Sequence, residues 1–236
     1  MLNIVNTDTK YSAHCKKLVN TYIEQIVTPD VRYLLELAFS KVSEDFWHEA
    51  ASSTGKYHPL YACGEAGLAR HTIAAVHFLE RWFIAYNFTP YVKDIMLAAL
   101  LLHDTCKRGI HFEDRWTLFE HPILVRELID SQQLTPNQRN MWFSICNMIA
   151  CHMGRWNTPS QKDLEKNMER IVLAFSNYRG TLIQYDSPQF MNLISLPVPK
   201  SFEEQIVANC DFCAADKECM LTIFDQDKEA WANVTR

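Results

Sequence analysis

The chain has 236 residues, of which 48% are hydrophobic and 22% charged, with only 6 glycines and a formal net charge of −5. This length and composition fit one large globular domain, and the low glycine count disfavours an all-β fold, whose many turns use glycine. The negative charge disfavours a long nucleic-acid groove, which needs clustered lysine and arginine. It remains compatible with a local positive site for a small phosphorylated substrate.

Targeting features are absent from the sequence pattern. The N-terminal residues lack the apolar stretch of a signal peptide, and the longest apolar run, residues 95–102, is far too short to span a bilayer. We therefore expect a cytoplasmic protein with no membrane partner and reduced cysteines. Cys210 and Cys213 are expected to be small buried helix residues rather than a redox or zinc site, because no second pair lies at zinc-finger spacing.

Apolar residues at helical spacing predict helices along most of the chain. In chain order these helices are expected within residues 10–50 (divided at Pro29), 66–86, 89–103, onward from 121, 136–152, 164–175 and onward from 201. The helix over 89–103 is apolar nearly all round, which is typical of a central core helix. Ser201 with Glu204 predicts a capping box, whereas residues 176–199 have no clear pattern. The sequence therefore predicts a mostly helical single domain.

Six residues with chemically useful side chains lie on or beside the apolar faces of these helices: His71, His103, Asp104, His121, His152 and Asp211. A single histidine on such a face is more often a hydrogen-bonded core residue than a ligand. Burying four imidazoles and two carboxylates is costly unless they are paired or metal-bound, and a divalent ion offsets the cost for all of them. Imidazole with carboxylate suits Mn, Fe, Co, Ni or Zn, and Mg is a further candidate.

The order of these residues resembles the HD-domain metal-dependent phosphohydrolase superfamily. That pattern has a histidine, a later His-Asp pair and a distant aspartate, which His71, His103-Asp104 and Asp211 match; His121 and His152 resemble the two histidines added in two-metal members. The segments LLLHDTCK, EHPILVRELI, IACHMGRWNTP and ANCDFCAADK are similar to the family's segments around these positions. Upstream, STGKYHP and GEAGLARHT are similar to the HD domain of certain bacterial 3′–5′ exoribonucleases and of related bacterial and phage proteins.

The resemblance implies an all-α fold and its organisation. We expect an HD-domain helical bundle over residues 51–220 with an insertion at about 160–195, before the last core helix. Residues 1–50 would form an N-terminal helical extension packed on the core, and residues 221–236 a C-terminal tail.

The resemblance also implies one or two divalent metal ions. The first would be held by His71, His103, Asp104 and Asp211, and the second by His121 and His152, with Asp104 as a bridge. A metal-activated water would then attack the phosphate ester, which makes Asp104 a catalytic residue.

Other side chains are candidates for the substrate. Lys107 is expected to stabilise a phosphate oxygen or an outer carboxylate, with a solvated surface lysine as the alternative. Weaker candidates for phosphate contacts, each equally compatible with a solvated surface, are Lys56, His58, Arg70 and Arg155. Trp156, near His152, is expected either to stack on a base or to belong to the core.

These features predict a phosphohydrolase or phosphodiesterase acting on a nucleotide or short oligonucleotide, with small nucleotides favoured over long RNA because the chain is acidic. The alarmone-hydrolase branch is disfavoured, because Thr105-Cys106-Lys107 stands where its acidic pair would follow the His-Asp. One alternative is a non-catalytic HD-fold module for nucleotide binding or regulation, which is disfavoured because no expected ligand is missing. Another is a purely structural helical protein with hydrogen-bonded core histidines.

Overall fold

The computed structural model describes residues 9–52, 58–217 and 219. Within these ranges the chain folds into α-helices and short 3-10 helices without a β-strand, so the predicted all-α class is confirmed. The expected C-terminal tail, residues 221–236, lies outside the described residues. No helix in the described part of the chain is both long and apolar enough to cross a membrane.

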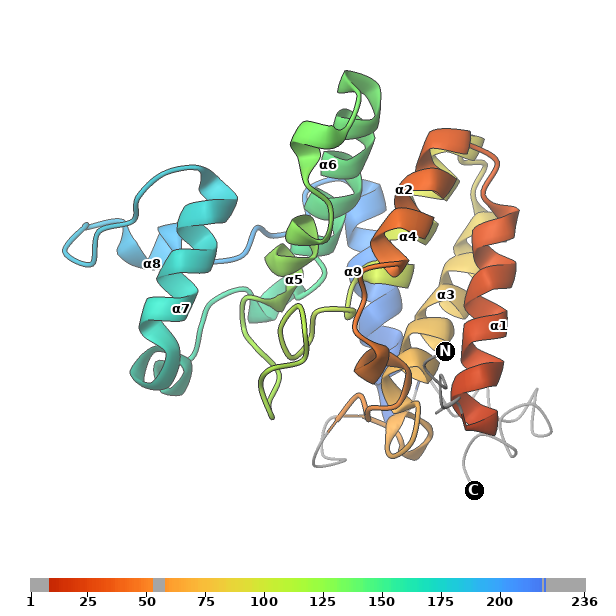
Figure 1. The fold of residues 1–236 in the computed structure, drawn as a ribbon, viewed down its shortest axis with the longest axis horizontal. Coiled ribbons are helices and arrows are strands. Elements are labelled where there is room, and N and C mark those ends of the chain that lie inside the picture. The colour runs from red at the N-terminus through yellow and green to blue at the C-terminus, as the bar shows by residue number, and fades with distance from the viewer. Residues whose placement is uncertain (1–8, 53–57, 218, 220–236) are drawn as a thin grey trace, which may run out of the picture.

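The α-helices are, in chain order, α1 (Lys10–Gln25), α2 (Pro29–Phe39), α3 (Gly67–Ala85), α4 (Pro90–Leu102), α5 (His121–Leu124), α6 (Pro136–Ala150), α7 (Gln161–Arg179), α8 (Phe190–Leu193) and α9 (Phe202–Ala215). The 3-10 helices are Glu44–Trp47, Leu60–Ala62, Val125–Leu128, Ser131–Gln133 and Gly154–Trp156. Figure 1 shows α1, α2, α3, α4, α6 and α9 gathered in one bundle, while α7 and α8 stand apart at one side of it.

The helix starts follow from local chemistry. Capping boxes, in which a side chain at the helix start and one three residues later satisfy each other's backbone amides, begin α1, α6, α7 and α9. In α9 the Ser201 hydroxyl accepts from the Glu204 amide at 3.1 Å, and the Glu204 carboxylate accepts from the Ser201 amide at 3.0 Å. The predicted box is therefore confirmed. Proline at the first helical position starts α2, α4 and α6.

Helix α4 forms the centre of the bundle. Every residue from Asp94 to Leu102 is buried, as expected for a helix that is apolar on all sides. Residues of α1 and α2 belong to the same apolar cluster, so the N-terminal segment packs on the core. Because α4 ends at Leu102, it delivers His103 and Asp104 directly into the middle of the molecule.

The helix expected from His121 is shorter than its apolar spacing suggested. α5 has only four residues and tightens into the 3-10 helix Val125–Leu128. Trp142 Nε1 donates to the Arg126 carbonyl at 3.4 Å, and the Asp130 side chain caps the next turn by accepting from the Gln132 amide at 3.0 Å. These contacts stop the α-helix from continuing.

Residues 160–195, the expected insertion, contribute to a second apolar cluster. α7 is longer than the expected 164–175 because Ser160 caps its start and Gly180, at φ 66°, ends it. α8 lies in the stretch for which no element was predicted. A second apolar cluster joins residues of α7 and its following loop to Phe119, Ile123 and Ala150 of the bundle side. The insertion is thus packed onto the segment around α5.

Candidate metal centre

Five helices bring the six expected residues together. His71 lies in the second turn of α3, His103 and Asp104 follow α4, and His121 begins α5. His152 lies just after α6, and Asp211 is in α9. All are buried except Asp211, whose side chain is 20% exposed.

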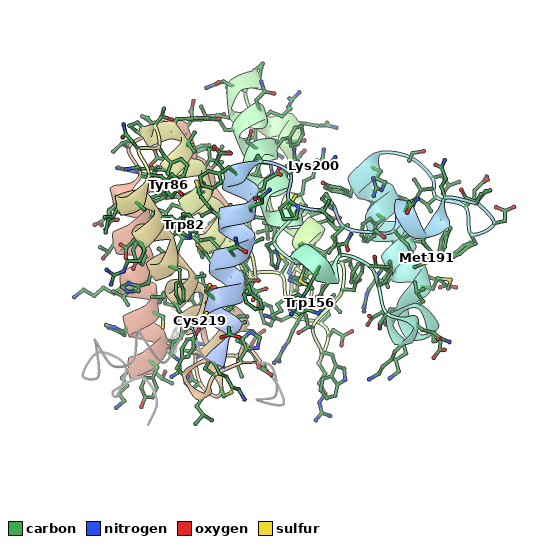
Figure 2. All side chains as sticks on the ribbon, turned by 180° about the vertical axis from the view of Figure 1, so that it is seen from behind. Trp82, Tyr86, Trp156, Met191, Lys200 and Cys219 are labelled. Atoms are coloured by element: carbon green, nitrogen blue, oxygen red, sulfur yellow. The ribbon has the colours of Figure 1, made fainter. Side chains whose placement is uncertain are left out.

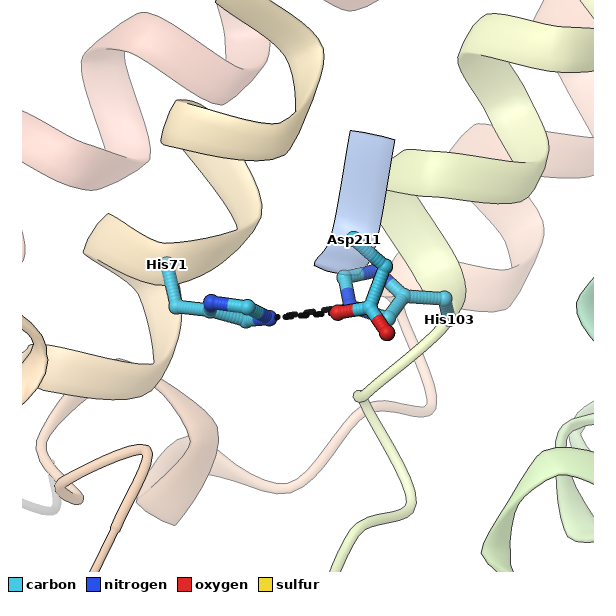
Figure 3. Close-up of side chains that lie close together, drawn as sticks. All are labelled: His71, His103 and Asp211. Atoms are coloured by element: carbon cyan, nitrogen blue, oxygen red, sulfur yellow. Dashed lines mark hydrogen bonds and ion pairs between the residues drawn. The ribbon is translucent and has the colours of Figure 1, made fainter. Parts of the chain in front are cut away.

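The first group consists of His71, His103 and Asp211 (Figure 3). The Nε2 atom of His71 lies 2.8 Å from Asp211 Oδ1, and that of His103 lies 3.3 Å from the same oxygen. The two Nε2 atoms are 3.4 Å apart. One donor atom from each of the three residues therefore faces a common point.

The second group consists of Asp104, His121 and His152. The Nε2 atoms of His121 and His152 are 3.3 Å apart and lie 3.2 and 3.9 Å from Asp104 Oδ1. The other carboxylate oxygen of Asp104, Oδ2, is 3.7 Å from His71 Nε2 and 3.6 Å from His103 Nε2. Asp104 therefore turns one oxygen toward each group.

Three of the histidines are held by the same kind of hydrogen bond. In each, Nδ1 lies within hydrogen-bonding distance of the carbonyl three residues earlier: His103 to Leu100 at 2.6 Å, His121 to Leu118 at 2.6 Å and His152 to Ile149 at 2.7 Å. A carbonyl can only accept, so Nδ1 carries a proton, and in the neutral form of each ring the lone pair is on Nε2. This is the arrangement that orients an imidazole as a metal ligand.

The facing nitrogens fit a bound cation. Two neutral Nε2 lone pairs at 3.3 Å repel each other unless a proton or a metal ion lies between them. Two nitrogens bound at ~2.1 Å to one tetrahedral ion lie ~3.4 Å apart, which agrees with both Nε2–Nε2 distances. Each group thus offers two imidazoles and a carboxylate, a donor set that suits a first-row divalent ion.

Burial and charge set the protonation states. Burial by itself would raise the pKa of Asp104, but Lys107 and His103 outweigh it and hold that pKa well below the ordinary value. The pKa of Asp211 is likewise well below its usual range, because His103 and His71 overcome the effect of burial. Burial lowers the pKa of His152 to about 3, so this ring is neutral at physiological pH. The carboxylates are charged, as metal ligands must be.

Lys107 belongs to the centre. It is buried, and its Nζ lies 2.5 Å from Asp104 Oδ2. The alternative of a solvated surface lysine is therefore wrong.

The weaker candidates lie in different places. The His58 ring is 5.0 Å from that of His71, and burial lowers its pKa to about 3. Arg70 is buried. Its guanidinium donates to the Cys63 carbonyl at 2.9 Å and lies over the Tyr11 ring. Lys56 lies outside the described residues.

Arg155 and Trp156 lie beside α9. The Arg155 guanidinium is 4.3 Å from the Trp156 ring and 5.7 Å from the ring of Phe212, the residue after Asp211. Trp156 is 52% exposed and stacks on Phe212 with ring centres 6.2 Å apart, so it is a surface residue rather than a core residue (Figure 2).

Glu120 was missed in the sequence analysis. It precedes His121, its side chain is fully buried, and its Oε1 accepts from Arg170 Nε on α7. The sequence offers only a weak signal for this pair, because helical spacing does not relate residues that are 50 positions apart. Cys210 is buried as expected, whereas Cys213 is partly exposed.

A comparison with protein families gives one match. The model of the HD domain family matches residues 68–216, a span that contains all six residues of the two groups. No curated protein and no solved structure matches the chain.

Proposed function

The chain belongs to the HD-domain family, and from this premise we propose that it is a metal-dependent phosphohydrolase that cleaves a phosphate ester of a nucleotide or short oligonucleotide. The observation that carries the proposal is the presence of two adjacent groups, each with two facing Nε2 atoms. Asp104, a member of the second group, turns one carboxylate oxygen toward each of them. We assign His71, His103 and Asp211 to one ion, and His121 and His152 to another, with Asp104 between them.

A bound metal pair would acidify a water molecule and neutralise charge on the phosphoryl oxygens. The chain's own residues prepare the centre for this chemistry. The carbonyls of Leu100, Leu118 and Ile149 fix the imidazoles with Nε2 free. Lys107 places a positive charge at Asp104, where it also favours an incoming phosphate oxygen. Burial keeps bulk water away from all ligands except Asp211.

The surface next to Asp211 supports a nucleotide over a plain phosphate ester. Trp156 and Phe212 are exposed, nearly parallel aromatic rings, and Arg155 adds a positive charge beside them. Exposed aromatic rings with an arginine are suited to stacking a base while the cation attracts phosphate. We therefore propose that the base lies on this surface, with Arg155 as a phosphate contact.

The test compares two buried aspartates of the same region. Asp104→Asn removes the carboxylate charge between the two groups, whereas Asp94→Asn changes an α4 residue whose Oδ2 accepts from the Thr28 amide at 2.7 Å. Metal content and Mn-dependent hydrolysis of a panel of nucleotides and phosphodiesters are measured for both. We expect Asp104→Asn to lose activity by at least about 100-fold and to bind less metal, and Asp94→Asn to keep both.

Two results would replace this proposal. Native protein that binds metal but hydrolyses nothing in the panel would favour a non-catalytic nucleotide-binding or regulatory module. Native protein that binds no metal would favour a structural role for the histidines.

A further inference from the structure

We propose that Arg170, on α7 of the insertion, is a positioning residue for the second group (Asp104, His121 and His152). The inference rests on the proposed two-metal centre. It gives the insertion a role, which is to hold His121 in the geometry that binds the second ion.

The contact is an ion pair next to His121 between a buried carboxylate, that of Glu120, and a guanidinium on α7 that is partly exposed. Arg170 Nε donates to Glu120 Oε1, and Arg170 Nη1 donates to Asp114 Oδ2 at 2.9 Å. The Glu120 side chain is fully buried, and its second oxygen has no hydrogen-bond partner among the described residues. Arg170 therefore supplies the compensating charge for a carboxylate that water does not reach.

Removing Arg170 would leave this carboxylate buried and unpaired, which is strongly unfavourable. Glu120 would then regain hydration by turning toward the solvent that Arg170 faces. Because Glu120 is bonded directly to His121, that movement would displace the first residue of α5 and with it the imidazole.

The insertion also packs on both sides of His121. Phe175 of α7 stacks on Phe119, with ring centres 6.1 Å apart and an angle of 24°. Ile123, two residues after His121, belongs to the same apolar cluster as Ile171 of α7. Figure 1 shows α5 between α6 and α7, as these contacts require.

The first group has a different support. His71 and Asp211 come from α3 and α9, whose buried apolar residues lie in the main cluster, and His103 follows α4 of the same cluster. Loosening α7 should therefore weaken the second group and leave the first intact. This selectivity separates positioning from a general loss of stability.

The test measures bound metal as well as activity. Native protein, Arg170→Met and the control Arg179→Met are titrated with Mn²⁺ by calorimetry, and bound metal is counted by elemental analysis. Arg179 lies on the same helix but donates to the Leu193 and Ser195 carbonyls inside the insertion. We expect two ions in native protein and in Arg179→Met. In Arg170→Met we expect affinity for one ion to fall about 10- to 100-fold, as is typical when support of a metal ligand is lost.

A second variant tests the ion pair itself. The double change Glu120→Leu with Arg170→Met removes both charges and keeps an apolar filling, so it should restore the second ion at least in part. Arg170→Gln removes the charge but keeps a polar side chain, and it carries the comparison if Arg170→Met does not fold.

The possible failures are distinguishable. If native protein bound no metal, both the proposed function and this inference would be overturned. Two ions at native affinity in Arg170→Met, or in Arg170→Gln where Arg170→Met does not fold, would overturn the role of Arg170 alone. Equal weakening of both ions would mean that α7 supports the fold in general, which also contradicts the inference.

Discussion

Single imidazoles in this molecule are tuned by burial. His152 and His58 both have a pKa lowered to about 3, chiefly because the charged form is excluded from water. In the unfolded chain each would titrate near 6.5. Both rings therefore stabilise the folded protein fully above that pH, and this contribution is lost as the pH falls toward 3.

We therefore expect the metal-free protein to lose folding stability as the pH falls. In chelator-treated samples, urea unfolding should show stability falling between pH 6.5 and 4, and His152→Gln should show a shallower fall over the same window. His103, whose pKa is raised, is protonated in both folded and unfolded chains below 6.5 and adds no slope there. Asp104 and Asp211, whose pKa values are lowered, add to the fall only from about pH 5 downward, where the unfolded carboxylates begin to protonate, and they do so in both proteins. Equal slopes for the native protein and His152→Gln would contradict this account.

The identities of the six central residues could be predicted from their order in the sequence. Their pairing could not, because the grouping of His71 with Asp211 and of His121 with His152 depends on helix packing across up to 140 residues. The sequence does not determine the placement of Lys107, since a lysine three residues after an aspartate at a helix end can face inward or outward. Only the packed structure distinguishes these cases.

The start of α3 lies in close contact with the loop before it. A Cβ atom on Gly67 would lie 2.2 Å from the Ala62 carbonyl oxygen and 2.7 Å from the Ala62 carbonyl carbon. The loop before α3 therefore passes so close to the first turn that only glycine fits, and His71 follows one turn later.

Gly67→Ala should accordingly destabilise the protein by about 1–3 kcal/mol, because backbone rather than a flexible side chain must move. Gly180→Ala is the matched control, because the added Cβ atom would meet no other atom. We expect this variant to lose about 1 kcal/mol of stability, solely because alanine disfavours a positive φ. Urea unfolding of both variants measures whether Gly67→Ala is the more destabilising change. A Gly67→Ala protein as stable as the native one would show that the loop yields easily.

Helix boundaries followed from the sequence where capping residues or proline mark them, as at Thr89-Pro90, Thr135-Pro136 and Ser201. The short α5 and the isolated α8 were not predictable. Their extents depend on partners distant in sequence, such as the indole of Trp142 against the Arg126 carbonyl.

The part of the chain that the structure describes contains two apolar clusters, one in the bundle and one that includes residues of α7. The two groups of histidine and aspartate side chains lie among helices that belong to these clusters. Bound metal should therefore stabilise the folded chain as a unit, because ions that bind only the folded form add RT ln(1 + [L]/Kd) to its stability.

Chelation should lower the melting temperature, and saturating Mn²⁺ should restore it. The shift should be strongly reduced in Asp104→Asn, which lacks the carboxylate charge between the two groups. Differential scanning fluorimetry with and without chelator measures this directly. An unchanged melting temperature in native protein would contradict metal binding at these groups.

The separation of His71 and Asp211 by 140 residues has a consequence for biosynthesis. A ribosome adds about 5–20 residues per second, so Asp211 emerges many seconds after His71. Asp104, His121 and His152 span a much shorter stretch and are all made before α9. We therefore expect the nascent chain to assemble the second group before the first. The first group is complete only when α9, which carries Asp211, packs onto the bundle.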